Sequence, residues 1–132
     1  MLGMVGVVFA VWLRLYQTRI GEMQRRRIHP QAVASAKAMV EALEDARAAD
    51  NFKNLFELPV LFFAACLAAM VTGVDSNVAL GLAWAFVAFR ALHSWIACTY
   101  NKVMHRFQAY LAGGLALFGL WAWQAWLWSR VA

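Results

Sequence analysis

The stretch DNFKNLFELPVLFF, residues 50–63, passes from polar sequence into continuous apolar sequence. Asn51, Asn54 and Glu57 recur at helical spacing, and Glu57 already stands among leucine, phenylalanine and valine residues. An ionised side chain inside a membrane helix costs a few kcal/mol and needs a polar partner. The stretch therefore predicts a helix that enters a membrane and carries a carboxylate with it.

The composition favours a membrane protein over a soluble one. The chain has 132 residues, of which 64% are apolar and 14% are charged, and its mean hydropathy is +0.57. A soluble domain carries about 25% charged residues on average. We expect a single all-α domain, residues 1–132, because isolated loops and open sheet edges cannot face lipid. The net charge of +5 reflects loop topology in this context, so no nucleic-acid partner is expected.

Four apolar stretches predict an integral membrane four-helix bundle, with spans at about 1–16, 55–74, 78–100 and 109–128. A helix needs about 20 residues to cross roughly 30 Å of hydrocarbon, and the last three stretches meet that length. The first stretch is shorter. It has no basic residues before its apolar run, so we interpret it as a membrane helix and not as a signal peptide.

Basic residues cluster in the connection 17–54 and again at Lys102 and Arg106, whereas the turn VDSN, residues 74–77, has none. By the positive-inside rule both basic connections are cytoplasmic and both termini lie on the opposite side. The arginines at 25–27 suit this topogenic role or contact with anionic lipid headgroups. After Pro30 the connection lacks glycine and proline up to Pro59, which predicts that the second membrane helix begins well before the membrane and kinks at Pro59.

Two polar stripes are predicted on neighbouring helices. The first follows i, i+4, i+7, i+10 spacing and contains Arg47, Asn51, Asn54 and Glu57. The second lies on the third span and contains Arg90, His93, Tyr100 and Asn101. Since Glu57 and Arg90 have opposite charges, we expect them to pair and offset each other's cost in the membrane.

Two interpretations of the stripes remain open. Glu57 and Arg90 could be a buried ion pair that only sets the register of the bundle. Alternatively, the additional asparagine, histidine and tyrosine side chains surround a ligand or a water-filled cavity, which we favour. Guanidinium groups bind carboxylates bidentately, so the arginines around the cytoplasmic mouth favour a small anionic ligand.

The two cysteines predict no metal or redox site. Cys66 and Cys98 lie within apolar runs, form no CxxC pair, and have no metal-ligand spacing with the three histidines. Buried thiols in helix cores explain both.

The segments RAADNFKNLFELPVLFF, residues 47–63, and RALHSWIACTYNKVMHRF, residues 90–107, resemble the signature regions of the MAPEG family, the membrane-associated proteins in eicosanoid and glutathione metabolism. The matches are Arg47 with Asn51, and Arg90 with His93 and the later Tyr100. The resemblance covers the whole chain and is closest to the short bacterial members, which implies a bacterial inner-membrane location.

The resemblance implies a homotrimer that binds glutathione as a co-substrate near the cytoplasmic side. It implies a transferase or peroxidase that acts on small lipophilic electrophiles or hydroperoxides dissolved in the membrane. The first stripe and Arg90, His93 and Tyr100 would then bind glutathione, and Arg106 would activate its thiol as the catalytic residue. This chain departs from the best-known animal members at Asn54, where they have glutamate, and at Ala97, where some relatives have histidine or tyrosine.

A second hypothesis is a catalytically silent MAPEG-like scaffold or accessory subunit of a larger membrane complex. Gly113, Gly114 and Gly119 permit close helix approach in either case. A transporter is a weaker third option, because the chain has few spans and no internal repeat.

Overall fold

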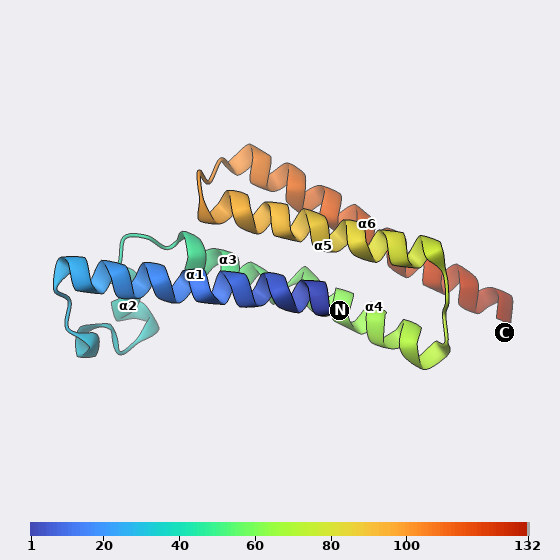
Figure 1. Ribbon diagram of the computed structural model, residues 1–132, viewed down its shortest axis with the longest axis horizontal. Helices are drawn as coiled ribbons and strands as arrows, with labels where there is room; N and C mark the ends of the chain where they lie inside the picture. Colours follow the sequence, from blue (N-terminus) through green and yellow to red (C-terminus); the bar gives the residue numbers. More distant parts are fainter. Residues whose placement is uncertain (132) are drawn as a thin grey trace.

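The computed structural model describes residues 1–131, and this part of the chain is helical with short connections (Figure 1). In chain order the elements are α1 (Leu2–Arg26), the 3-10 helix η1 (Pro30–Val33), α2 (Ala36–Ala42), α3 (Arg47–Asn54), α4 (Leu58–Thr72), α5 (Asn77–Cys98) and α6 (Val103–Val131). The expected all-α class is confirmed for the described residues.

The long helices form an elongated bundle. α5 and α6 run side by side as an antiparallel hairpin, α1 packs against α3 and α5, and α4 packs against α6 (Figure 1). The connection that contains η1 and α2 lies at the end of the bundle where α1 finishes. The turn between α4 and α5 lies at the opposite end. The chain therefore brings α3 against α5 at the end where the connection returns.

Two helical stretches are long and apolar enough to cross a membrane, Arg47–Thr72 and Asn77–Cys98. These are the second and third expected spans. The first and fourth expected spans each fall inside a single long helix, α1 and α6 respectively. Large apolar side chains also cover much of the outer surface: Val71 is 86% exposed, Leu115 67% and Trp84 60%. A surface of this kind suits a lipid environment.

The core lies where α1, α4, α5 and α6 meet. Met4, Phe62, Phe86 and Leu117 are fully buried there. The rings of Phe62 and Phe86 stack with centroids 4.8 Å apart, which joins α4 to α5. This apolar core holds the helices in register beneath the polar residues described below.

The predicted second helix is interrupted twice. The chain leaves helical structure between Ala42 and Arg47, so the expected continuous helix from Pro30 to Pro59 is wrong. It leaves helical structure again between Asn54 and Leu58, and Pro59 stands in the first turn of α4. Proline has no N–H to donate there and is tolerated at the start of a helix. The predicted irregularity at Pro59 is therefore confirmed, as a break between α3 and α4.

Three glycines of α6 face other helices of the same chain. A Cβ atom built at Gly113 would lie 3.4 Å from Phe89 Cβ, and one built at Gly119 would lie 3.6 Å from Leu82 Cδ2, both on α5. At Gly114 the nearest atom would be Leu58 Cδ1 of α4, at 3.8 Å. The predicted close approach of helices at these glycines occurs within the chain.

We expect Gly113→Leu to destabilise the protein by roughly 1–3 kcal/mol, since overpacking forces neighbouring side chains out of position. Gly81→Leu is the matched control, because it makes the same change inside a helix where no atom lies within 4 Å. Thermal unfolding in detergent measures both. Equal midpoints for the two variants would contradict the close approach of α6 to α5.

Candidate functional site

The two predicted polar stripes face each other where α3 packs on α5. Arg47 Nη1 donates to the Thr99 carbonyl at 2.7 Å, and Arg90 Nη2 donates to the Asn54 carbonyl at 2.8 Å. Between them, Asn51 is 2% exposed. These contacts pair the start of α3 with the end of α5, as antiparallel neighbours require. We call the residues Arg47, Asn51, Asn54, Arg90, Ser94 and Cys98 the α3–α5 seam.

Asn51 finds partners on α5 that the sequence patterns did not indicate. Its Nδ2 donates to Cys98 Sγ at 3.7 Å, and Ser94 Oγ donates to its Oδ1 at 3.5 Å. Ser94 is 4% exposed and Cys98 is half-buried. Spacing could have revealed Ser94, because it stands four residues after Arg90 and four before Cys98 on one helix face. It was missed because serine is common on apolar helices.

Arg90 is fully buried, with an exposed fraction of 0%. Its Nη2 bonds to Asn54, but its Nε and Nη1 have no hydrogen-bond partner in the described part of the chain. Its guanidinium carbon lies 5.4 Å from the centre of the Tyr110 ring on α6, a cation–π contact. A buried charge with two unpaired donors is costly, so this position favours an additional acceptor.

His93 lies beside Arg90 and shares its surroundings. It is 3% exposed, its Nδ1 has no partner among residues 1–131, and its ring lies 5.8 Å from that of Tyr110. The predicted neighbours on the second stripe therefore lie together in the interior.

The predicted ion pair between Glu57 and Arg90 is wrong for this structure. Glu57 is exposed and lies in the break between α3 and α4, with φ −96° and ψ −101°. The spacing that joined it to Asn54 assumed an unbroken helix, and the break removes that register. Over the described residues, Glu57 makes no ion pair with Arg90, which bonds to the Asn54 carbonyl instead.

Tyr100 and Arg106 lie at the turn between α5 and α6, where each contacts a near neighbour in sequence. The Tyr100 hydroxyl lies 3.1 Å from His105 Nδ1 and the side chain is half-exposed. Arg106 Nη1 donates to Asn101 Oδ1 at 2.7 Å. Asn101 has a φ of 50°, a left-handed conformation that asparagine tolerates well, and it reverses the chain here. Within the described chain, neither side chain bonds to the α3–α5 seam.

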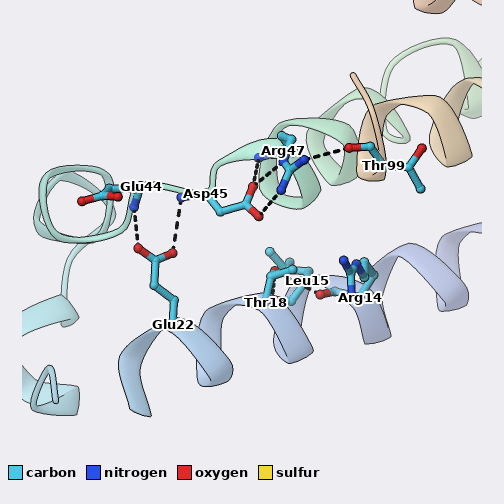
Figure 2. A network of polar contacts seen from close by, with 8 residues as sticks. All are labelled: Arg14, Leu15, Thr18, Glu22, Glu44, Asp45, Arg47 and Thr99. Carbon is cyan, nitrogen blue, oxygen red and sulfur yellow. Dashed lines mark hydrogen bonds and ion pairs between the residues drawn. The ribbon is translucent and has the colours of Figure 1, made fainter. Parts of the chain in front are cut away.

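Figure 2 shows the polar network that precedes the seam. Glu22 of α1 is 4% exposed, and it accepts hydrogen bonds from the backbone N–H groups of Glu44 at 2.8 Å and Asp45 at 3.3 Å. Arg26 Nη1 lies 3.0 Å from the same carboxylate. The Glu44 N–H, the Arg26 side chain and the Asp45 N–H hold the pKa of Glu22 below its ordinary value of 4.5.

Arg47 is occupied by a carboxylate from its own chain. Its Nε and Nη2 donate to the two oxygens of Asp45 at 2.9 and 2.8 Å, a bidentate ion pair. The hydrogen bond from Arg47 keeps the pKa of Asp45 below its ordinary value. Glu22, Arg25, Glu44, Asp45 and Arg47 line a surface depression of about 390 Å³ at this place.

The chain matches the family model of the MAPEG family over residues 1–130. It belongs to the MAPEG family. No curated protein and no solved structure matches it. MAPEG proteins are membrane-associated, and the two apolar helical stretches of this member agree with that setting. The predicted family resemblance is confirmed over nearly the whole chain.

The Glu22 network predicts acid sensitivity. Because the folded pKa of Glu22 is lowered, its contribution to stability is complete above pH 4.5 and is lost as the pH falls through the folded value. We expect Glu22→Gln to lower the thermal midpoint at pH 7 and to lower it progressively less below pH 4.5. Thermal unfolding in detergent from pH 7 to pH 3 measures the difference from the unmodified protein.

Glu41→Gln is the control, since Glu41 is exposed and the ion pair that it forms within residues 1–131, with Lys37 at 4.0 Å, is also exposed. A midpoint difference for Glu22→Gln that stays the same at pH 3 and pH 7 would contradict the assignment.

The corrected position of Glu57 leads to a second prediction. Glu57→Gln should change the free energy of unfolding by no more than about 0.5 kcal/mol, as for most exposed sites. A double-mutant cycle with Arg90→Met should give a coupling energy below about 1 kcal/mol, because within residues 1–131 the two side chains form no ion pair and interact only through their charges at a longer distance. A coupling energy well above 1 kcal/mol, measured by thermal or denaturant unfolding, would show that Glu57 and Arg90 do form an ion pair.

Proposed function

We propose that this MAPEG protein is a membrane-bound, glutathione-dependent transferase or peroxidase that acts on lipophilic electrophiles or hydroperoxides. The observation that carries the proposal is the fully buried guanidinium of Arg90, which has two unpaired donors beside the unpaired Nδ1 of His93. A fold that needed only a stable interior would place apolar side chains here. The family includes glutathione transferases and peroxidases, and also other members.

In this proposal the α3–α5 seam and the adjacent end of α5 bind glutathione. Arg47 contacts a carboxylate, Asn51 and Asn54 contact the peptide groups, and Tyr100 lies along the peptide. Arg90 and His93 provide donors at the buried end of the site. Glu57 keeps a predicted role only at the exposed mouth, because it lies outside the seam.

Arg106 is the proposed catalytic residue. A free thiol has a pKa of about 8.5, so little thiolate is present at neutral pH. A guanidinium roughly 4 Å from the sulfur stabilises the thiolate by up to about 4 kcal/mol at an effective dielectric constant of 20. The thiolate sulfur then bonds to the electrophilic carbon, where it displaces the leaving group or adds to an activated double bond. With a hydroperoxide it bonds to the outer oxygen, breaks the O–O bond and releases the alcohol, and a second glutathione thiol converts the resulting sulfenic acid to the disulfide and water. No metal takes part in this proposed mechanism.

An apolar cavity supports a lipophilic second substrate. It has a volume of about 480 Å³, and its lining includes Leu2, Phe62, Leu80, Trp84 and Val87. Val87 stands one helical turn before Arg90 on α5. A molecule dissolved in the membrane could therefore approach the buried end of the seam through apolar surroundings.

The proposed assembly is a homotrimer in the bacterial inner membrane, with four spans per subunit and both termini on the non-cytoplasmic side. The basic connections support this orientation, since the arginines of residues 25–27 stand at the end of α1, from which the chain leads through η1 and α2 to the start of α3. Contact with anionic lipid headgroups would follow from the same cluster.

One observation favours the scaffold alternative. The carboxylate-binding edge of Arg47 is already filled by Asp45, and Arg106 is bonded to Asn101. A chain that had lost its ligand could retain such contacts as structural ones. The catalytically silent scaffold is therefore the second candidate. A test for thiolate formation distinguishes it from a glutathione-dependent enzyme.

We expect glutathione to give a saturable thiolate absorbance with the purified protein in detergent. Arg106→Ala should abolish the thiolate signal, whereas Arg47→Ala should retain it at weaker affinity. Arg90→Met should bind glutathione more weakly and should also lower the thermal midpoint, because it removes the hydrogen bond to the Asn54 carbonyl and the contact with the Tyr110 ring. Ultraviolet difference titration measures affinity and thiolate together. If the stable, assembled protein gives no thiolate signal at millimolar glutathione, the result would support the scaffold and contradict the proposed enzyme.

A further inference from the structure

The contact between Asp45 and Arg47 has the geometry that a bound carboxylate would use. Both Asp45 oxygens are engaged by the Nε and Nη2 of Arg47 (Figure 2). The Asp45 side chain is 28% exposed and the Arg47 side chain is 44% exposed, so solvent and ligands can reach both. Any ligand carboxylate that binds this edge of Arg47 must therefore displace Asp45.

Each partner of this ion pair is also held by a separate contact. The Arg47 backbone N–H donates to Asp45 Oδ1 at 3.2 Å, and the Asp45 N–H donates to Glu22 Oε2 at 3.3 Å. Arg47 Nη1 remains on the Thr99 carbonyl at 2.7 Å. If a ligand separates the two side chains, the carboxylate stays at the start of α3 and the guanidinium stays against α5. The site thus offers one fixed negative and one fixed positive charge.

Arg14 of α1 adds a second positive charge to this place. It is exposed, and its guanidinium has no ion pair or hydrogen bond within the described residues. It lies close enough to Asp45 for its charge, after the hydrogen bonds from Arg47, to help lower the pKa of that carboxyl. Figure 2 shows it on the helix that faces the start of α3. The sequence patterns singled out neither Arg14 nor Asp45.

We propose that Arg14, Asp45 and Arg47 form a receptor for the ionised groups of a ligand with two carboxylates and one ammonium. This inference rests on the proposed function, because glutathione carries that set of charges. Arg47 releases Asp45 and takes the α-carboxylate of the γ-glutamyl end. Asp45 takes the α-ammonium, which is attached to the same carbon, and Arg14 takes the glycine carboxylate.

The exchange makes the ammonium group necessary for good binding. A ligand with an α-carboxylate and an α-ammonium replaces the internal Asp45–Arg47 pair by two new pairs, carboxylate with Arg47 and ammonium with Asp45. A ligand without the ammonium replaces the Asp45–Arg47 pair by one pair between its carboxylate and Arg47, and it leaves the Asp45 carboxylate without a cationic partner. Partly exposed charge pairs contribute up to about a fivefold change in affinity each. Asp45 is therefore a specificity-determining residue in this proposal.

The test compares S-methylglutathione with its deamino analogue, in which hydrogen replaces the α-amino group. Isothermal titration calorimetry on the full-length protein in detergent gives both dissociation constants. We expect the unmodified protein to favour S-methylglutathione by roughly three- to fivefold. In Asp45→Asn the preference should disappear, mainly because the analogue binds more tightly once Arg47 is free.

Glu44→Gln is the matched control, since it removes a neighbouring carboxylate from the same depression and should leave the preference unchanged. Asp45→Ser, which keeps an acceptor for the Arg47 N–H, provides a second neutral variant if Asp45→Asn fails to fold. Arg14→Gln should lose affinity for S-methylglutathione but not for its glycine amide.

Two outcomes would overturn the inference. Saturable binding with the same preference in the unmodified protein and in both Asp45 variants would remove the role of Asp45 and leave the proposed function standing. No saturable binding of S-methylglutathione by the unmodified protein would overturn the receptor and the glutathione-dependent function together.

Discussion

The burial of Arg90 is the constraint on which the arrangement of α3, α5 and α6 depends. Over residues 1–131 its one hydrogen bond goes to a backbone carbonyl, that of Asn54 at the last residue of α3. A carbonyl at the end of a helix has no partner within the helix, and the Asn54 carbonyl accepts from the guanidinium and, at 3.5 Å, from the Glu57 backbone N–H. Tyr110 covers the opposite side from α6. The break at residues 55–57 thus leaves a carbonyl that the buried arginine binds.

Helical periodicity was sufficient to predict which residues of α3 and α5 share a face. Arg47, Asn51, Asn54, Arg90 and His93 lie as their spacing indicated, because both segments are regular helices. The same periodicity failed at Glu57, where Pro59 starts a new helix and the register is lost. Local patterns thus predicted the α3 residues of the seam and Arg90, but not Ser94 and Cys98 on the same face of α5.

Helical periodicity missed Glu22 and Asp45 for two different reasons. Glu22 is 22 residues from Glu44 in sequence, and only the return of the connection beside α1 brings its carboxylate to that backbone. Asp45 stands two residues before Arg47, a spacing that no helical pattern selects. The Glu22 contact depends on how the connection 27–46 folds back, whereas the Asp45 contact is local and begins outside any regular helix, so helical periodicity indicates neither.

The glycines of α6 have a consequence for anything that packs against this protein. All three point toward α4 or α5 of the same chain, where they let helices approach closely. Leu111, Leu115 and Phe118 remain on the outer surface, each at least half-exposed, at helical spacing. A neighbouring subunit or lipid that contacts this face meets bulky side chains. α6 therefore approaches helices of its own chain closely through its glycines, whereas a molecule on its outer face contacts leucine and phenylalanine side chains and stays farther from its backbone.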